Sequence, residues 1–180
     1  MEVSKKGGKT IMDSSLSVVV AKKDGALETA APGDRVSDAV EKMHQKSIGA
    51  LPVVEGDGIV GIFTERDALY RVTHSKLDPD ATPVSEVMTK DPDCVSPEMS
   101  VIDAMRMVNE KRFRHLPLVK DGKLVGLVSS GDLTRWVVDE QKAEINDLSQ
   151  NAKSLASKNK ALIALVGAFA VLIVVGILTT

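Results

Sequence analysis

Residues 48–67 read IGALPVVEGDGIVGIFTERD, and the pattern returns 65 residues later as FRHLPLVKDGKLVGLVSSGD at residues 113–132. Extended towards the N-terminus, the alignment pairs residues 36–67 with residues 101–132 without a gap, and ten of these 32 positions are identical. The identical pairs are Val36/Val101, Asp38/Asp103, Ala39/Ala104, Lys46/Lys111, Leu51/Leu116, Pro52/Pro117, Val54/Val119, Val60/Val125, Gly61/Gly126 and Asp67/Asp132. A fixed offset of this kind indicates two copies of one supersecondary unit.

Both copies predict the same order of elements, β-α-β-β-α. A short strand leads into a helix whose apolar residues recur at i, i+3, i+4 and i+7, and two short strands joined by a Gly/Asp turn follow. The expected strands are 27–30, 50–54 and 59–63 in the first copy, and 94–96, 116–119 and 124–128 in the second. A second helix is expected after Gly61 and after Gly126. One such unit is too small to bury its own apolar face, so the two copies should pack on each other.

The two copies resemble CBS domains, the module named for cystathionine β-synthase, and the pair resembles a Bateman module. The segments that carry the resemblance are 48–54 with 61–67, 114–119 with 126–132, and the connecting 84–89 with 95–98. It is nearest to stand-alone CBS pairs with no attached enzyme. It implies an α/β fold in which two CBS units pack as a pseudo-two-fold pair. The expected boundaries are a polar tail at 1–17, CBS domain 1 at 18–82 and CBS domain 2 at 86–144.

Thr64 with Asp67, and Ser129 with Asp132, stand in each copy where a strand turns into a helix. On the residues alone, a hydroxyl at the N-cap and an acid three positions later form a variant of the capping box. The same place suits a phosphate, because the first helical N–H groups and the helix dipole favour an anion there. Both interpretations stay open at this point.

The resemblance adds ligand roles to these motifs. In CBS pairs the hydroxyl residue commonly meets phosphate and the Asp meets ribose, with the base between the copies. The ligand-binding residues that this implies are Thr64, Arg66, Asp67, Arg114, His115, Ser129 and Asp132. The alternatives are a surface salt bridge for Arg66 and a solvent-facing strand end for His115. The expected ligand is an adenine nucleotide (AMP, ADP or ATP) or S-adenosylmethionine, with no cofactor required and no metal site.

The two copies differ in charge beside these motifs. Residues 114–115 are Arg-His where residues 49–50 are Gly-Ala, and residues 65–66 are Glu-Arg where residues 130–131 are Ser-Gly. If one cleft binds more tightly, we expect it to be the one that combines Ser129 and Asp132 with Arg114 and His115. Arg112 is a further candidate for the face that carries Arg114.

Composition excludes several classes of function. A formal net charge of -2 and an aromatic content of 3% argue against a nucleic-acid partner. The three histidines (His44, His74 and His115) show no metal-ligand spacing, and no nucleophile or phosphate-loop motif of an enzyme occurs. We therefore expect a regulatory module and not an enzyme. The alternative is a dimerisation or scaffold module that binds no ligand.

Residues 161–178 form a run of 18 residues without a charged or strongly polar side chain. A helix of that length spans about 27 Å, close to the thickness of a bilayer core. Lys153, Lys158 and Lys160 precede the run, so the positive-inside rule predicts a single-pass tail anchor with the CBS module in the cytoplasm. The polar N-terminus predicts no signal peptide, and the single cysteine, Cys94, fits a reducing compartment.

Residues 139–160 predict a helical stalk between the repeat and this run. Apolar and small residues recur alternately three and four apart from Val138 to Leu162, as in a heptad pattern. Polar or small residues at several of these positions weaken the seam, so pairing of the stalk itself is left open. The expected partners are a second copy of the chain in a homodimer, the lipid bilayer through 161–178, and an unidentified regulated protein.

Overall fold

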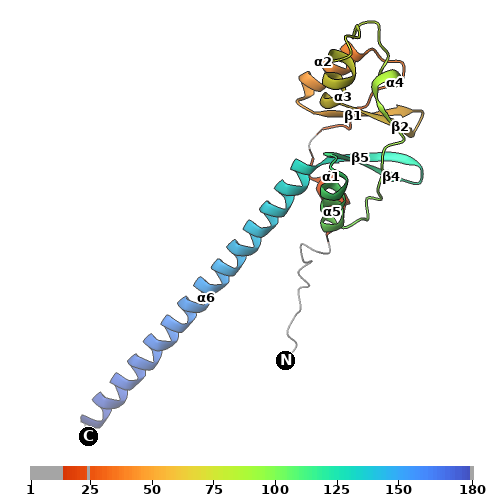
Figure 1. The fold of residues 1–180 in the computed structure, drawn as a ribbon. Coiled ribbons are helices and arrows are strands. Elements are labelled where there is room, and N and C mark those ends of the chain that lie inside the picture. The colour runs from red at the N-terminus through yellow and green to blue at the C-terminus, as the bar shows by residue number, and fades with distance from the viewer. Residues whose placement is uncertain (1–13, 24, 179–180) are drawn as a thin grey trace. The chain divides into compact units, whose positions relative to one another are not determined.

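The computed structural model describes residues 14–23 and 25–178, with side chains for 14–23 and 25–160. It contains two compact units, Met1–Trp136 and Val137–Thr180. The elements, coloured in chain order in Figure 1, are α1 (Leu16–Ala21), α2 (Val36–Lys46), β1 (Ala50–Glu55), β2 (Gly58–Thr64), α3 (Glu65–Asp67), the π-helix η2 (Ala68–Thr73), α4 (Val84–Val87), β3 (Thr89–Lys90), α5 (Val101–Lys111), β4 (His115–Lys120), β5 (Lys123–Ser129) and α6 (Ser130–Leu178).

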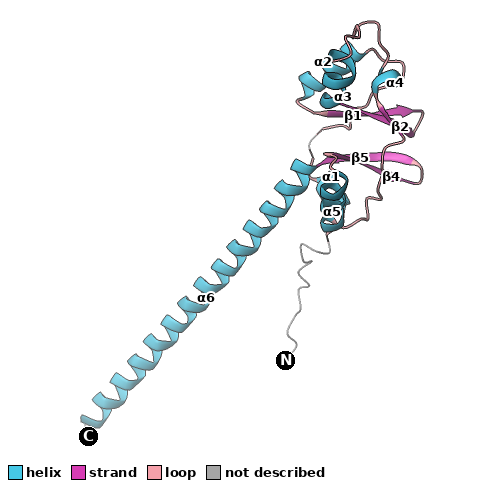
Figure 2. Cartoon of the chain, viewed as in Figure 1, coloured by secondary structure: helices cyan, strands magenta, loops and turns pink. Residues whose placement is uncertain are grey.

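Two antiparallel hairpins form the centre of the first unit. In the first copy β1 pairs with β2, and β3 adds a third strand along the other edge of β2; in the second copy β4 pairs with β5. The registers match, with Leu51 opposite Phe63 and Leu116 opposite Val128. Figure 2 shows the two sheets next to each other, with the helices of each copy on the outer side. The predicted α/β pair of repeated units is confirmed.

The strand that was expected to open each copy is shorter than predicted. Only single parallel bridges occur, Ala30 with Val53 and Val95 with Leu118. After Ala30 the chain turns at once towards α2, closed by the bond from Asp34 N–H to the carbonyl of Ala31 at 3.1 Å. The second hairpin strand is longer than predicted in both copies, because it runs on to the N-cap of the next helix.

Helix α1 begins at Leu16, two residues before the predicted start of CBS domain 1 at residue 18. Leu16 is fully buried, and its N–H donates to the carbonyl of Met99 at 2.9 Å. The N–H of Val101 donates to the backbone carbonyl of Ser14, also at 2.9 Å. The packed part of the chain therefore includes residues 14–17. The physical reason is that α1 presents an apolar face, completed by Val19, to the second copy.

Helix α4 makes the matching contacts on the first copy. The N–H of Val84 donates to the backbone carbonyl of Asp34 at 2.8 Å, and the N–H of Val36 donates to the backbone carbonyl of Thr82 at 3.0 Å. Each copy is thus completed by a helix that the sequence places in front of the other copy.

Two identical glycines allow these helices to approach. A Cβ at Gly61 would overlap the Sδ atom of Met88, and a Cβ at Gly126 would lie 3.1 Å from a methyl group of Val20. Met88 directly follows α4, and Val20 belongs to α1. The glycines therefore leave room for the side chains that bring each short helix onto its sheet.

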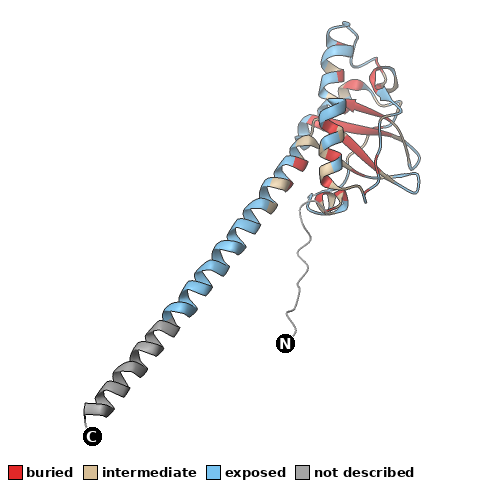
Figure 3. Ribbon diagram, turned by 60° about the horizontal axis from the view of Figure 1, so that its bottom comes forward, coloured by how far each residue is buried: buried red, intermediate tan, exposed pale blue. Residues whose placement is uncertain are grey.

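Apolar side chains from α2, β1, β2 and α4 form the core of the first copy, around fully buried Phe63. In Figure 3 the buried class follows the strands and the inner faces of the helices. Because Phe63 directly precedes Thr64, this core anchors the end of β2 at the first strand-to-helix corner.

Helix α6 is continuous from Ser130 to Leu178, so the prediction of a helix over 139–160 is confirmed. The described side chains from residue 141 onwards are exposed, as the pale blue of Figure 3 shows, and they include Ile145, Leu148 and Leu155. Across the described residues we find no helix with both the length and the apolar character that a membrane crossing needs. The side chains of the predicted membrane segment, 161–178, lie outside the described residues.

Candidate functional site

A closed hydrogen-bonded cap forms at the end of β2. The Oγ1 atom of Thr64 accepts from the N–H of Asp67 at 3.2 Å, and Asp67 Oδ2 accepts from the N–H of Thr64 at 3.0 Å and from its hydroxyl at 2.6 Å. The structural interpretation of this motif as a capping box is confirmed. The hydroxyl hydrogen and one carboxylate oxygen are therefore used within the motif.

The same cap forms at the end of β5. Asp132 Oδ2 accepts from the N–H and the hydroxyl of Ser129, both at 2.8 Å, and the N–H of Asp132 donates to Ser129 Oγ at 3.1 Å. Both aspartates are thus held in position before any ligand arrives.

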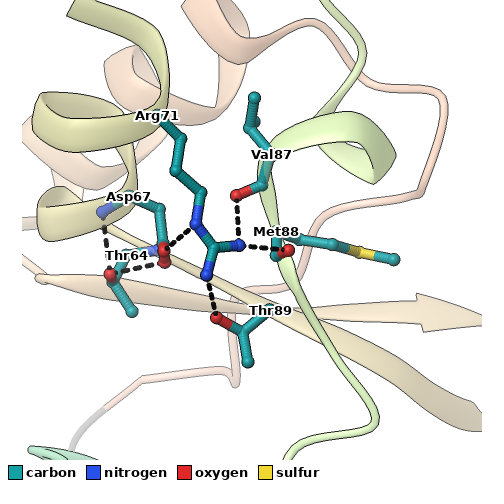
Figure 4. Close-up of polar contacts among 6 residues, drawn as sticks. All are labelled: Thr64, Asp67, Arg71, Val87, Met88 and Thr89. Atoms are coloured by element: carbon teal, nitrogen blue, oxygen red, sulfur yellow. Dashed lines mark hydrogen bonds and ion pairs between the residues drawn. The ribbon is translucent and has the colours of Figure 1, made fainter. Parts of the chain in front are cut away.

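The two aspartates differ in the cation that neutralises them. Arg71, one helical turn after Asp67, places Nε 3.3 Å from Asp67 Oδ1. Its other nitrogens donate to the carbonyls of Val87 and Met88 and to the hydroxyl of Thr89, as Figure 4 shows. Asp132 instead meets Lys23, from the segment after α1, with Nζ 2.9 Å from Oδ2.

Replacing Arg71 with methionine is expected to lower the free energy of unfolding by about 1–2 kcal/mol, a figure reduced because the arginine is partly exposed. The substitution leaves the buried carboxylate of Asp67 and two linker carbonyls without this donor. Chemical denaturation measures the change. Arg66→Met is the matched control, because Arg66 is exposed and adjacent; an equal loss in both variants would contradict the structural role of Arg71.

Each capping motif opens onto its own cavity. The Thr64 cavity has a volume of about 380 Å³ and is lined by Gly49, Ile62, Thr64, Arg66, Asp67, Arg71, Thr89, Asp91, Pro92, Asp93, Phe113, Arg114 and His115. The Ser129 cavity is larger, about 530 Å³, and its polar lining comes from Lys23, Glu28, Ser47, His115, Ser129, Asp132 and Arg135. Both cavities draw residues from both copies.

The structure changes one predicted grouping. Arg114 was expected beside Ser129 and Asp132, but it lines the Thr64 cavity together with Arg66. Its carbonyl accepts from the N–H of Ser130 at 2.9 Å, so only its backbone lies at the other corner. His115 lines both cavities, so the side chain of Arg114 shares the Thr64 cavity with His115 and does not line the Ser129 cavity. Arg112 lines neither cavity; it ends α5 in the left-handed conformation, at φ 57.

Sequence reasoning missed six charged residues of the cavities, which are Lys23, Glu28, Arg71, Asp91, Asp93 and Arg135. Arg71 and Arg135 follow their aspartates by four and three positions, so helical spacing could have identified them. No local pattern indicates Lys23, because its contact with Asp132 joins residues 109 positions apart.

His115 lines both cavities. Burial lowers the pKa of His115 below its ordinary value, and the nearby charge of Arg114 acts in the same direction, against Glu65 and Asp132. The pKa of Asp132 is also lowered: burial raises it, but hydrogen bonds from Lys23 and Ser129 outweigh that effect. At neutral pH the site therefore holds a neutral imidazole and an ionised carboxylate.

Acidification from about pH 7.5 to about pH 5.5 is expected to destabilise the protein through His115. Its folded pKa lies below 6.5, so the unfolded chain takes up the proton first, and stability falls with pH until the folded pKa is passed. Unfolding free energies at both pH values measure this loss. His115→Gln should reduce it, whereas His74→Gln, at an exposed position, should not; an unchanged loss in the His115 variant would contradict the prediction.

Across residues 14–23 and 25–160, no group of three or more His, Cys, Asp or Glu side chains could hold a metal ion. What the arrangement offers is a pair of prearranged carboxylates, each beside a cation, in cavities between two repeats. That combination suits a ligand with hydroxyl donors and a negative group.

Comparison with known proteins identifies the repeat. The sequence profile of the CBS domain matches residues 11–74 and 84–139. The mitochondrial CBS domain-containing protein CBSX3 of Arabidopsis thaliana is 37% identical over 131 residues, which are 70% of this chain and 64% of that protein. The chain thus spans less than two thirds of this curated relative.

Two solved structures are similar over nearly their whole length. A candidate signal-transduction protein with CBS domains from Burkholderia ambifaria MC40-6 has a TM-score of 0.68 and 39% identity, over 71% of this chain and 96% of that one. CBSX2, solved in complex with AMP, has a TM-score of 0.60 and 27% identity, over 71% and 98%. Because this chain covers 96% and 98% of these two structures, both resemble stand-alone CBS pairs with little else attached, as the sequence predicts. The chain belongs to the CBS-domain family.

Proposed function

We propose that this CBS pair is a regulatory module that binds an adenine nucleotide, or the related S-adenosylmethionine, in the Ser129 cavity and signals its occupancy to a partner protein. The observation that carries the proposal is the pattern of hydrogen bonds at the carboxylate of Asp132. Its described donors all meet Oδ2, so Oδ1 is left to accept hydroxyl groups of a ligand in a cavity of about 530 Å³.

The Thr64 cavity offers less to such a ligand. Both carboxylate oxygens of Asp67 are engaged, Oδ2 by Thr64 and Oδ1 by Arg71. The side chain of Asp67 is 10% exposed, against 19% for Asp132. A ribose at Asp67 would have to displace Arg71, which makes this the weaker of the two sites, although Arg66 and Arg114 also line it.

The relative CBSX2 supports the class of ligand, because its structure contains AMP. The roles of Thr64, Arg66, Asp67, Arg114, His115, Ser129 and Asp132 are part of the proposal. Lys23 and Arg135 join this set as the cations that the Ser129 cavity provides for a phosphate.

Calorimetric titration of the full chain with AMP, ADP, ATP and S-adenosylmethionine tests the function. At least one should bind and raise the melting temperature, since a ligand of the folded state stabilises it by mass action. If none of the four gives heat or a thermal shift, the alternative of a dimerisation or scaffold module is favoured. The closed capping boxes would then be purely structural.

The membrane segment and the homodimer remain predictions from the sequence. The apolar run at 161–178 is the basis for the first, and Lys153, Lys158 and Lys160 before it are the reason to expect the module in the cytoplasm. Expressed in cells, the full chain should stay with the membrane fraction after carbonate washing, and a chain ending at residue 160 should be released. Release of both forms would contradict a membrane span. Sedimentation of the shortened form measures dimerisation separately.

A further inference from the structure

Lys23, which follows α1, reaches the Ser129 cavity. Its Nζ atom donates to Asp132 Oδ2 at 2.9 Å and to the carbonyl of Leu127 at 3.0 Å. Its side chain is 42% exposed and forms part of the cavity wall. The ammonium group is therefore close to both the carboxylate and the space that a ligand would fill.

The carbonyl of Leu127 is available because, in the described part of the chain, no third strand pairs with β5. In the first copy, Ile62 pairs with Thr89 of β3. In the second copy, Leu127 is the counterpart of Ile62, and the described residues form a two-stranded sheet of β4 and β5. Lys23 supplies one donor where a third strand would otherwise run. The lysine is thus part of the second copy's own architecture and not a surface side chain that happens to be near.

An ammonium group has three N–H donors. Among the described residues, Lys23 uses two of them, on Asp132 and Leu127. One donor is therefore left for a ligand in the cavity. Arg71, the corresponding cation of the Thr64 cavity, is held by four partners instead of two, because Asp67 and three linker oxygens engage four of its five N–H donors.

We propose that Lys23 is the residue that makes the Ser129 cavity select a nucleotide over the corresponding nucleoside. The inference rests on the proposed function. A ribose that donates to Asp132 Oδ1 brings the 5′ substituent within reach of a lysine already held on Oδ2. A phosphate accepts a charge-assisted hydrogen bond from it, whereas the 5′ hydroxyl of a nucleoside offers a much weaker acceptor.

The test compares AMP with adenosine as calorimetric ligands of the full chain. An Asp67→Asn background weakens binding in the Thr64 cavity, so that the Ser129 cavity dominates the signal. Lys23→Met keeps the length of the side chain and removes the charge. We expect the affinity for AMP to fall roughly 10- to 100-fold, the range of a hydrogen bond between charged groups, and that for adenosine to change by less than about threefold.

Lys23→Arg is the matched variant, because it retains the charge, and it should keep a preference for AMP over adenosine. An equal loss of both ligands in Lys23→Met would overturn the inference, since Lys23 would then only hold Asp132 in place. Undiminished AMP binding would overturn it as well. If the chain without the Lys23 substitution binds neither ligand, the proposed function itself fails, which is a different result from a lost preference.

Discussion

Replacing Phe63 with alanine is expected to lower the free energy of unfolding by about 3–5 kcal/mol, the usual cost of removing a buried aromatic ring. Phe63 is 0% exposed, lies opposite Leu51 in the first hairpin and belongs to the core formed with α2 and α4. For a unit of this size the loss corresponds to a melting temperature lower by about 10–20 °C. Thermal unfolding followed by circular dichroism measures it.

The same variant shows whether the copies unfold together. Trp136, the single tryptophan, is buried in the second copy, so its fluorescence reports on that half while the substitution lies in the other. We expect the fluorescence and circular dichroism curves to shift together, because α1 and α4 tie each copy to the other. A tryptophan transition that stays at its original temperature would show independent copies. Leu69→Ala, at a largely exposed apolar position, should change stability by less than about 1 kcal/mol.

Asp132→Asn is expected to weaken nucleotide binding by about a hundredfold or more, because hydrogen bonds from the ribose would lose their charged acceptor. Asparagine retains an oxygen that can accept from the N–H of Ser129, so the helix cap survives. The matched variant is Asp67→Asn, for which we expect a smaller effect because Arg71 occupies that carboxylate. Titrations of both variants with AMP show which substitution costs more affinity. A larger loss of affinity in the Asp67 variant would make the Thr64 cavity, and not the Ser129 cavity, the tighter site.

The repeat and its order of elements could be predicted because the hairpins and the helices α2 and α5 recur at one constant offset. Helix α1 could not be predicted in this way. Residues 14–21 correspond to 82–89, an offset of 68, and share only Ser17/Ser85 and Val19/Val87. A gapless alignment at an offset of 65 residues therefore does not pair these two segments. In addition, a short segment with three serines is predicted to be polar.

The two capping motifs were predictable because they depend on residues three positions apart. The charges around them were not, because tertiary packing decides which cavity a side chain enters. Arg114 and His115 are neighbours in sequence, yet Arg114 lines only the Thr64 cavity. Lys23 reaches Asp132 from a segment that the repeat does not include. A local sequence pattern does not show how segments that are far apart in the chain pack against each other.

Because α1 packs on the second copy and α4 on the first, dividing the chain between residues 81 and 82 separates each sheet from its helix. A fragment ending at residue 81 carries the helix that the second sheet needs, and one beginning at residue 82 carries the helix that the first sheet needs. Neither half can complete itself, but each holds the missing part of the other. Co-expressed, the two halves should therefore reassemble as a split protein, with a dependence on each other that simple tandem domains do not show.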